Sequence, residues 1–572
     1  MKNEIILYDY EASPCARRVK ICLMEKGISY RTQIIDLAKM EQKNPEYLRI
    51  NPNGLVPAIN HNGRVIFESS VIIAYLEDNF PKVKLSPKTS EGVIAAKQWE
   101  SYELSMANTY RPLMYASTMG PLQHIACTRD EFLSISAQAT DNPAHLAWQG
   151  KVWDLKVLNE TQKQQHRKTL VQFIDLVERS LENKKYLVEN TFTLADVSVY
   201  PRITMLPLVG VDINHYAYPN VCAWIERVGK RRSIRTTYSS TEKSMVKLND
   251  IGLTKLINRI VYKQSPATMM DKLIVKILRP ILRKKLGIDE ALLAPRNSNV
   301  RLISPDVSDT FSPATSDPVG VPEFLKNEPL MFYGYTGSPV SDRIVLVCKL
   351  LGIEYTHIEI DMASMEHTKK PFQELNPAGE LPLLLHGDTV INDSLFMAEY
   401  LSANKIDEDN ITSNNSPLLF SSDSYEQAEI RMWHAFDMGM KKEYRPLFFA
   451  AINKTAVVDS DMQRCLDVCS EKMTHLEAAL KSKEYLVGDR FSYADIVLYT
   501  RLSTFSLLGI DSCFESCPSI HQWLGNVEDR LSLITSSSNS TKVGSDKRKL
   551  KSTTKAKKTG KSKKSHSIAS EI

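Results

Sequence analysis

The residues with the clearest chemical potential stand where two predicted helices begin. Ser13 and Cys15 fall in the sequence SPC, in which Ser13-Pro14 is expected to open a helix. Glu68 and Ser69 form an acid–hydroxyl pair at the predicted start of another helix. The N-terminus of a helix favours an anion because its first backbone N–H groups are unpaired. A hydroxyl placed there can donate a hydrogen bond to the anion, and a thiol can ionise and act as a nucleophile.

The same pattern recurs in the second half of the chain. NPNGLVPAINHNGRVIFESS at 51–70 is answered by NPAGELPLLLHGDTVINDS at 376–394. Three landmarks are each repeated 325 residues later: Ser13 as Ser338, Pro57 as Pro382 and Glu68 as Asp393. One constant offset indicates a duplicated module, and two copies are too few for a solenoid. We therefore expect two complete units in tandem.

Each module is predicted to contain a small α/β domain. In the first copy, a buried strand at 4–10 is followed by a helix and by a second strand at 29–35. Two more strands, PAINH and RVIFE, flank an Asn-Gly turn, and a helix begins at Ser69. The order βαβ then ββα is the thioredoxin-like arrangement, and residues 330–402 repeat it.

A long helical stretch follows each small domain. TLADVSVYPRI in the first copy matches SYADIVLYTRL in the second, and both open with a capping-box pattern, Thr193-x-x-Asp196 and Ser492-x-x-Asp495. We expect both Asp residues to support folding rather than chemistry. The two motifs are 299 residues apart, so the first copy carries a net insertion of 26 residues, which we place within 118–165.

The composition is that of a globular protein with one unusual segment. Nine cysteines occur without any C-x-x-C, which favours reduced thiols in a cytoplasmic protein, and we expect no secretory signal, no spanning helix and no metal site. The net charge is +5, but residues 541–572 alone carry +9, which leaves −4 for the rest. The lysine-rich tail at 536–572 is predicted to be disordered. It can contact anionic lipid or nucleic acid, or simply be solvated.

Residues 241–325 match neither copy and form a linker. Their middle part, LTKLINRIVYKQSPATMMDKLIVKILRPILRKKLG, is apolar with interspersed Lys and Arg, and Pro280 is expected to interrupt any helix. A basic amphipathic segment can lie on an anionic membrane or pack onto the flanking domains. We favour packing, with residues 304–320 as a connector rich in Ser, Pro, Asp and Thr.

These motifs resemble the cytosolic glutathione S-transferase superfamily over roughly residues 4–235 and 328–530. NPEYLRINPNGLVPAI followed by FESSVIIAYLED is similar to its omega and zeta branches. The resemblance implies two tandem units, each a thioredoxin-like α/β domain followed by an all-α domain. The predicted boundaries are 1–85 and 88–240 in the first copy, 241–325 for the linker, 328–405 and 415–535 in the second copy, and 536–572 for the tail.

For the first copy, the resemblance implies a glutathione site. A cis bond between Val56 and Pro57 would present the preceding backbone to the cysteinyl part of glutathione. Glu68 would hold the γ-glutamyl ammonium, and Ser69 at the helix start would hold the γ-glutamyl carboxylate. Asn44 stands where the omega branch has a lysine near the glycyl carboxylate.

The catalytic candidates are Ser13 and Cys15. Ser13 matches the family's catalytic position, so it would stabilise the glutathione thiolate for conjugation or reductive displacement at a soft electrophile. Cys15 matches a cysteine of the zeta motif and would instead support a thiol reductase or isomerase. The electrophile would lie against Tyr102, Met106 and Tyr110, unless these side chains belong to the core.

The second copy would bind glutathione more weakly. Its candidate residues at the matching places are Ser338, Lys370, Leu381, Pro382, Asp393 and Ser394. Asp342 follows Ser338 closely and brings negative charge to a site that must hold an anion. Because family members usually dimerise, the two copies would form an intramolecular pseudo-dimer.

The expected function is that of a glutathione-dependent transferase. Glutathione would be the co-substrate, an electrophilic small molecule the second substrate, and detoxification and glutathione metabolism the implied roles. The non-enzymatic alternative is a scaffold with this fold that binds protein partners through its linker and tail.

Overall fold

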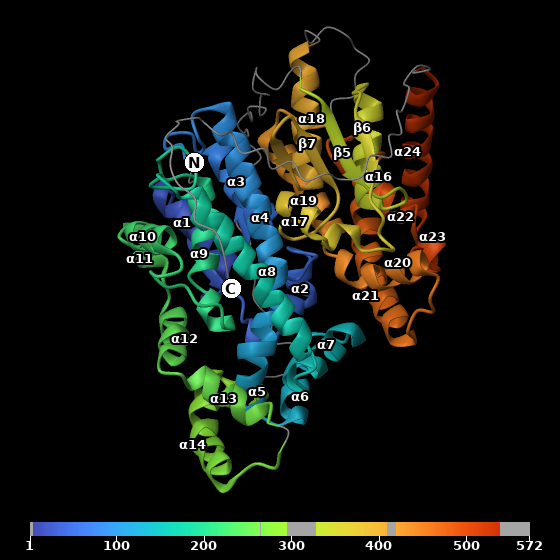
Figure 1. Cartoon of the computed structure of the whole chain (residues 1–572). Coiled ribbons are helices and arrows are strands. Elements are labelled where there is room, and N and C mark those ends of the chain that lie inside the picture. Colours follow the sequence, from blue (N-terminus) through green and yellow to red (C-terminus); the bar gives the residue numbers. More distant parts are fainter. Residues whose placement is uncertain (1–3, 264, 294–327, 409–418, 538–572) are drawn as a thin grey trace, which may run out of the picture.

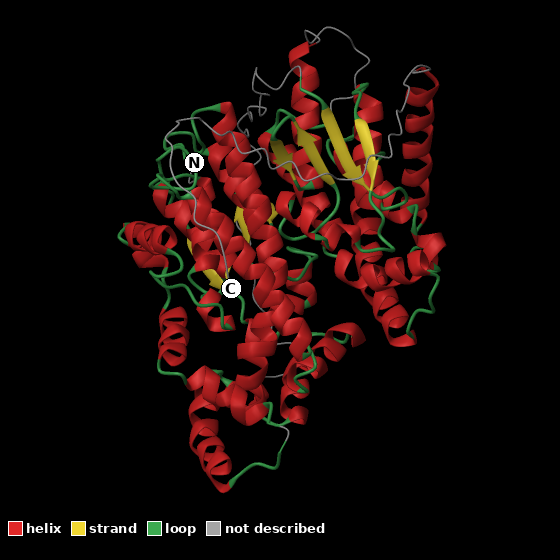
Figure 2. Ribbon diagram, in the orientation of Figure 1, coloured by secondary structure: helices red, strands yellow, loops and turns green. Residues whose placement is uncertain are grey.

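The structure, a computed structural model, contains two copies of one two-domain unit (Figure 1). It describes residues 4–263, 265–293, 328–408 and 419–537. The connector predicted at 304–320 and the tail beyond 537 lie outside these ranges. Each unit pairs a small mixed sheet with a helical domain (Figure 2), which confirms the predicted fold class.

The first sheet has the strand order β2-β1-β3-β4. Its strands are β1 (Ile5–Asp9), β2 (Arg31–Ile34), β3 (Ala58–His61) and β4 (Arg64–Phe67). β1 is fully buried and runs parallel to β2 and antiparallel to β3, so that Leu7 lies opposite both Thr32 and Ile59. The helices of this domain are α1 (Pro14–Glu25), α2 (Pro45–Leu48) and α3 (Ser69–Asn79). The chain therefore follows the predicted βαβ–ββα order.

The second sheet repeats the first with the order β6-β5-β7-β8. Its strands are β5 (Leu330–Gly334), β6 (Thr356–Glu359), β7 (Leu383–His386) and β8 (Thr389–Ile391). The accompanying helices are α16 (Pro339–Leu351), α17 (Lys370–Leu375) and α18 (Ser394–Glu408). Equivalent buried pairs, His61–Tyr75 and His386–Tyr400, tie the third strand to the third helix in both copies.

The helical domains differ by three helices. The first comprises α4 (Ser90–Met114), α5 (Gly120–Ala126), α6 (Arg129–Ala139), α7 (Pro143–Trp153), α8 (Glu160–Ser180), α9 (Leu194–Ile203), α10 (Pro219–Gly229), α11 (Arg232–Thr237) and α12 (Ser240–Asp250). The second comprises α19 (Ser424–Met438), α20 (Lys441–Asn453), α21 (Asp459–Leu480), α22 (Tyr493–Leu502), α23 (Phe505–Leu508) and α24 (Pro518–Ser537). The insertion expected within 118–165 contains α5, α6 and α7, whereas α20 leads directly to α21.

The repeated capping boxes are structural, as predicted. Asp196 accepts hydrogen bonds from the backbone N–H of Thr193 and, at 2.8 Å, from Trp224 Nε1. Asp495 does the same with Ser492 and Trp523, the latter at 2.9 Å. Burial raises the pKa of Asp196 to about 6. Each carboxylate therefore accepts hydrogen bonds from a helix start and from a buried indole, as a structural cap does.

A buried Arg–acid–Arg group joins the two domains of each copy. In the first copy, Glu103 on α4 contacts Arg18 of α1 and, at 3.0 Å, Arg202 of α9. In the second, Asp437 on α19 contacts Arg343 at 2.8 Å and Arg501 at 2.5 Å. Burial raises the pKa of Asp437, but the two guanidiniums outweigh it, so that the pKa lies well below its usual range.

The linker helices are α13 (Leu253–Val261), α14 (Met269–Lys285) and α15 (Ile288–Leu293). They pack on the insertion in a separate hydrophobic cluster. The expectation that Pro280 interrupts a helix is wrong, because α14 continues through it. Pro280 has no N–H for the carbonyl of Lys276, but both residues are exposed, so water can bind that carbonyl.

The two copies contact each other through reciprocal elements. α3 and β4 of the first copy pack against α19 of the second. Gln98 on α4 donates to the carbonyl of Val390 on β8 at 2.7 Å, and Lys97 lies 3.7 Å from Glu399 on α18. None of the helices in the described part of the chain has the length and apolar character that crossing a membrane requires.

Candidate functional site

Ser13 lies at the start of α1 and caps it. Its Oγ accepts a hydrogen bond from the backbone N–H of Ala16 at 3.2 Å, and the side chain is partly exposed. A hydroxyl that accepts this bond still carries its own proton, which it can donate to a bound anion. Pro14 at the first helical position fixes the helix start because its φ suits a helix and its missing N–H is not needed there.

The loop before β3 ends in a cis bond between Val56 and Pro57, as the resemblance implied. The preceding carbonyl, that of Leu55, accepts hydrogen bonds from Tyr47 Oη at 2.7 Å and from Asn51 Nδ2 at 2.8 Å. The second copy has the same cis bond, between Leu381 and Pro382. Tyr47 and Asn51, two side chains of the same domain, thus fix the loop before Pro57 in the first copy.

Glu68 stands between β4 and α3 with a φ of +67°. Non-glycine residues rarely adopt this conformation, and strained backbone of this kind clusters at functional sites. Among the described residues, the Glu68 side chain makes no capping hydrogen bond to α3, and its Oε1 lies 3.5 Å from Asn53 Nδ2. Burial raises the pKa of Tyr47, and the negative charge of Glu68 adds a smaller contribution in the same direction. The same charge partly opposes the arginines that lower the pKa of Cys15. Asn53 belongs to the loop that leads to Val56 and Pro57, where its backbone N–H donates to Asn51 Oδ1 at 3.0 Å. The Glu68 carboxylate therefore lies beside the cis-proline loop.

Cys15 lies two residues beyond Ser13 and is partly exposed. Arg202 Nη2 donates a hydrogen bond to its Sγ at 3.3 Å. Burial raises the pKa of the Cys15 thiol, but the charges of Arg202, Arg18 and Arg111 outweigh burial and bring it below its usual value. The thiol thus sits in a positive environment that favours its thiolate.

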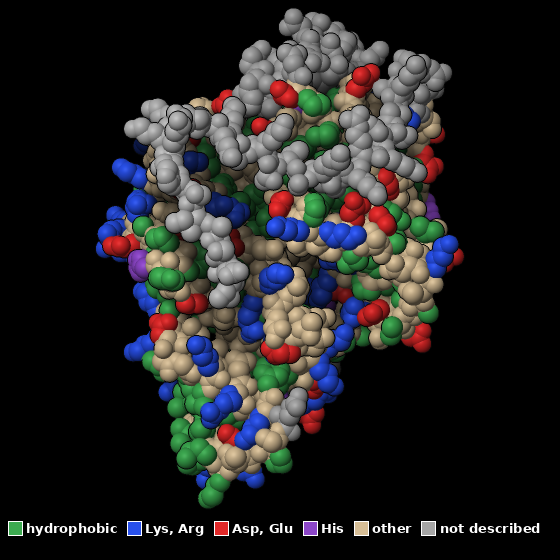
Figure 3. All heavy atoms as spheres, in the orientation of Figure 1, with side chains coloured by type: hydrophobic (Ala, Val, Ile, Leu, Met, Phe, Trp, Pro, Cys, Tyr) green, Lys and Arg blue, Asp and Glu red, His purple; other side chains and the backbone are tan. Residues whose placement is uncertain are grey.

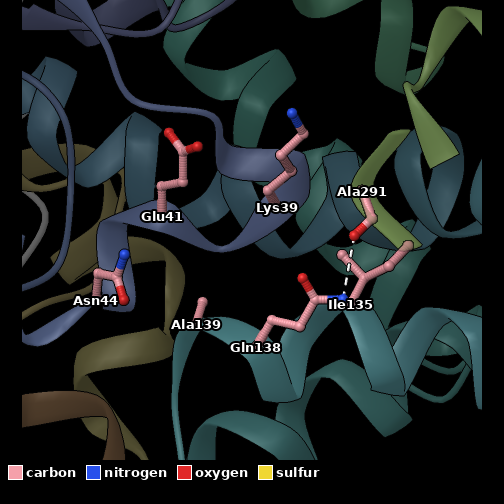
Figure 4. A pocket seen from close by; sticks show the side chains of 7 residues that line it. All are labelled: Lys39, Glu41, Asn44, Ile135, Gln138, Ala139 and Ala291. Atoms are coloured by element: carbon pink, nitrogen blue, oxygen red, sulfur yellow. Dashed lines mark hydrogen bonds between the residues drawn. The ribbon is translucent and has the colours of Figure 1, made fainter. Parts of the chain in front are cut away.

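Asn44 and the neighbouring Lys43 have different surroundings. Asn44 is buried and lines a small hollow of about 20 Å³, room for about one water molecule (Figure 4). The hollow lies between the loop before α2 and the helices α6 and α15, where Gln138 donates to the carbonyl of Ala291 at 3.1 Å. Lys43 Nζ donates to the carbonyl of Asn53 at 3.2 Å, and burial lowers the pKa of Lys43 to about 8. Lys43 is therefore a cation of the first copy that lies beside the loop of the candidate site.

In the second copy, the acid that matches Glu68 is hydrogen-bonded to its own helix. Asp393 Oδ1 accepts hydrogen bonds from the backbone N–H groups of Leu395, at 2.9 Å, and Phe396, at 3.0 Å, so it caps α18. Ser394 is the buried first residue of that helix. The Lys370 side chain is 88% exposed and 3.8 Å from Glu374 on its own helix.

The start of α16 also differs from that of α1. In the described chain, the side chain of Ser338 makes no capping hydrogen bond. Asp342 in the first turn accepts from the backbone N–H of Gly337 at 3.1 Å, and burial raises the pKa of Asp342. The position that matches Cys15 is Val340. The second copy thus keeps the cis proline but has neither the thiol nor an acid like Glu68.

Residues of the second copy reach the first-copy site, and sequence reasoning did not find them. Asn53 accepts a hydrogen bond from Lys472 on α21 and donates one to the carbonyl of Ala435 at 3.1 Å. The backbone N–H of Phe67, next to Glu68, points to Met432 Sδ at 3.2 Å. No pattern in the sequence connects residues so distant along the chain.

The three helical residues considered for the electrophile pocket lie in the core. Tyr102, Met106 and Tyr110 are all buried within the main hydrophobic cluster of the first copy. Tyr102 packs edge-on against Trp99 and Phe173. Of the two alternatives, the structure supports core packing.

Comparison with protein families identifies both halves of each unit. The profile described as "Glutathione S-transferase, N-terminal domain" matches residues 12–79 and 337–404. The profile described as "Glutathione S-transferase, C-terminal domain" matches residues 140–231 and 440–530. Together, these matches cover more than half of the chain.

Individual relatives each match one part of the chain. Protein LigF of Sphingobium sp. is 27% identical over 248 residues, 41% of this chain and 93% of that protein. A zeta-class glutathione S-transferase of Euphorbia esula is 42% identical over 86 residues, 15% of this chain and 38% of that protein. Among solved structures, the beta-etherase LigF of Sphingobium sp. aligns with a TM-score of 0.38 and 23% identity, over 41% of this chain and 98% of that one. The chain belongs to the glutathione S-transferase superfamily and carries two tandem copies of its two-domain unit.

Proposed function

We propose that the first copy binds glutathione and activates its thiol through Ser13, and that it is the principal active site of the protein. The observation that carries this proposal is the meeting of three parts at one place. Glu68 lies 3.5 Å from Asn53 in the loop that ends at the cis bond to Pro57. The charge of Glu68 also acts on the Cys15 thiol, in the first turn of α1. Together with Ser13 at the start of α1, these parts supply a hydroxyl that can donate to a thiolate, a cis-proline loop and an acid.

Each end of the tripeptide has a complementary group. The γ-glutamyl ammonium pairs with Glu68, and the γ-glutamyl carboxylate lies at the N-terminus of α3, beside the Ser69 hydroxyl. The cysteinyl backbone pairs with that of Val56, and the glycyl carboxylate is served by Lys43 or Asn44. Bound in this orientation, glutathione places its sulfur at Ser13.

The reaction follows from that orientation. The Ser13 O–H donates a hydrogen bond to the glutathione sulfur and stabilises its anion, while the thiol proton passes to solvent. The thiolate then attacks a soft electrophilic atom, a C–S bond forms, and any leaving group departs with its bonding electron pair. The N-terminus of α1 and the guanidiniums near Cys15 add positive potential for the sulfur anion.

Calorimetric titration with glutathione and with an S-alkyl glutathione tests the proposal. Native protein should bind with one dominant site. Ser13→Ala should retain binding but lose roughly 10²-fold in kcat/KM toward an aromatic halide, the scale of one lost donor to a developing charge. Ser338→Ala is the matched control and should change little. Absence of binding heat would contradict the proposal, as would equal losses in both variants.

A second reaction is favoured by the surroundings of Cys15. Its thiolate can attack one sulfur of a disulfide, forming a new S–S bond to that sulfur and releasing the other as a thiolate. Reduced glutathione would then regenerate Cys15 by the same exchange. Cys15→Ala should abolish such thiol transfer and leave conjugation nearly unchanged. Loss of conjugation in that variant would contradict the assignment of Ser13.

We further propose that the two copies form a pseudo-dimer within one chain. The support is reciprocal packing, with α3 of the first copy against α19 of the second, and Gln98 and Lys97 of α4 against β8 and α18. Light scattering after gel filtration should give the mass of a single chain at micromolar concentration. An obligate dimer of the whole chain would contradict this proposal.

A further inference from the structure

Helix α14 is apolar on two faces, and one of them is covered. Val275, Leu278 and Leu282 face inward and pack in the cluster formed with the insertion helices. Arg279 Nε anchors the same side by donating to the carbonyl of Ile125 on α5 at 2.9 Å. The packing expected for this linker is therefore present, but it covers only one side of the helix.

The opposite face is apolar and exposed. Four of its residues follow one another at intervals of four, which places them in one row along the helix. Their exposed fractions, with that of the neighbouring Met270, are Met269 90%, Met270 63%, Leu273 51%, Ile277 56% and Ile281 52%. Figure 3 shows hydrophobic side chains gathered at the lower end of the molecule, where Figure 1 places α14. Several large apolar side chains side by side on one surface usually mark an interaction site.

Lysines accompany this row. Lys272, Lys276, Lys284 and Lys285 of α14 are all exposed. The one acidic residue of the helix, Asp271, is buried, caps the first turn and pairs with Lys263 at 2.8 Å. The outer face thus offers apolar side chains and positive charge without an exposed carboxylate on α14 itself.

We propose that this outer face of α14 lies on an anionic lipid surface, with the apolar row inserted at the interface and the lysines among the headgroups. Apolar residues bordered by lysine are the composition of helices that lie in the plane of a membrane. The helix stands at one end of the molecule, where a flat surface can approach it (Figure 1). A second copy of the chain fits less well, since pairing through this face would bring two sets of lysines together.

Vesicle flotation of the full-length chain tests the proposal. The protein should float with vesicles of phosphatidylcholine and phosphatidylserine and remain unbound with phosphatidylcholine alone. Changing both Leu273→Gln and Ile277→Gln should lower partitioning at least about tenfold, because two apolar side chains are withdrawn from the interface. Lys272→Gln and Lys276→Gln should each lower it about fivefold, the equivalent of about 1 kcal/mol per charge near the surface.

Leu507→Gln is the matched control, since Leu507 is 71% exposed on α23 of the other copy. It should float like the native chain, and all variants should melt at the native temperature because the changed residues are exposed. The proposal is overturned if the double variant floats as well as the native chain, because the basic tail would then suffice. It is equally overturned by equal binding to neutral vesicles, by no flotation, or by self-association through this face without lipid.

Discussion

Lys472 of the second copy donates a hydrogen bond to the Asn53 side chain of the first copy. The amide of Asn53 in turn lies 3.5 Å from the Glu68 carboxylate, and the Lys472 ammonium stands 4.4 Å from the centre of the Phe436 ring. A single polar chain therefore connects α21 with the acid proposed to hold the γ-glutamyl ammonium. Both Lys472 and the loop that carries Asn53 are packed between the copies.

Replacing Lys472 should weaken glutathione binding by the first copy. Lys472→Met removes the donor that fixes Asn53, so we expect the Kd for glutathione to rise about fivefold, the effect of one hydrogen bond worth about 1 kcal/mol. Calorimetry measures this. Lys481→Met, which changes an exposed lysine at the end of the same helix, should leave the Kd unchanged. An unchanged Kd in Lys472→Met would show that Asn53 is positioned without the second copy.

The same substitution should alter how stability depends on pH. Burial, with a contribution from Lys43, lowers the pKa of Lys472 to about 7 in the folded protein, against 10.5 in a free lysine. Between pH 7 and 10.5 the unfolded chain binds a proton at Lys472 that the folded chain does not bind. The free energy of unfolding of the native chain therefore rises with pH over this range. Lys472→Met should therefore be most stable relative to the native chain near neutral pH, by an amount on the order of a few kcal/mol. Urea unfolding across this range would contradict the prediction if the difference stayed constant.

Cys15 should be the most reactive cysteine at neutral pH. Its pKa is lowered by arginines that outweigh burial, whereas burial raises the pKa of Cys222 and Cys517, the other partly exposed cysteines of the described chain. A lower pKa gives more thiolate, so iodoacetamide should label Cys15 first. Peptide mass spectrometry over time measures the rates. Similar rates at all three sites would argue against an activated thiol, and Cys15→Ala should remove the fast phase.

The buried Arg–acid–Arg group should be essential to the second copy. Asp437→Asn would leave Arg343 and Arg501 buried without a counter-charge, at a cost of about 3–5 kcal/mol. Because the pKa of Asp437 is depressed, its stabilisation is present above about pH 4 and is lost as the pH falls further.

Thermal melting of this variant can be compared with that of Asp388→Asn, which changes an exposed turn residue. The control should melt like the native chain. Equal melting temperatures for Asp437→Asn and the control would mean that the guanidiniums find other partners.

Much of the fold could be predicted because the same motifs occur in both halves of the sequence. The offset of 325 identified two modules, and the strand and helix order followed from turns and capping boxes that depend on local chemistry. Both cis prolines followed from the resemblance. Local signals were less reliable at Pro280, where an exposed carbonyl makes the proline tolerable in α14.

Contacts between the copies could not be predicted. Asn53 and Lys472 are 419 residues apart, and their meeting depends on how two folded units dock. The hydrogen bonds of Asp393 to its own helix were equally hidden, because the sequence does not show that Asp393 caps α18 while Glu68 makes no such bond to α3. The uncovered face of α14 also required the structure, since periodicity shows that a helix is apolar but not which side its neighbours occupy.

A homodimer must present the same residue to both of its active sites, but a fused pair is free of that rule. Here the positions that match Asn53 and Lys472 are Ala378 and Phe173. The second copy therefore provides a lysine to the loop of the first copy, but the first copy provides no equivalent lysine to the matching loop of the second. Each half of such a chain can change its sequence independently, so a contact that serves a site in one half need not be kept in the other.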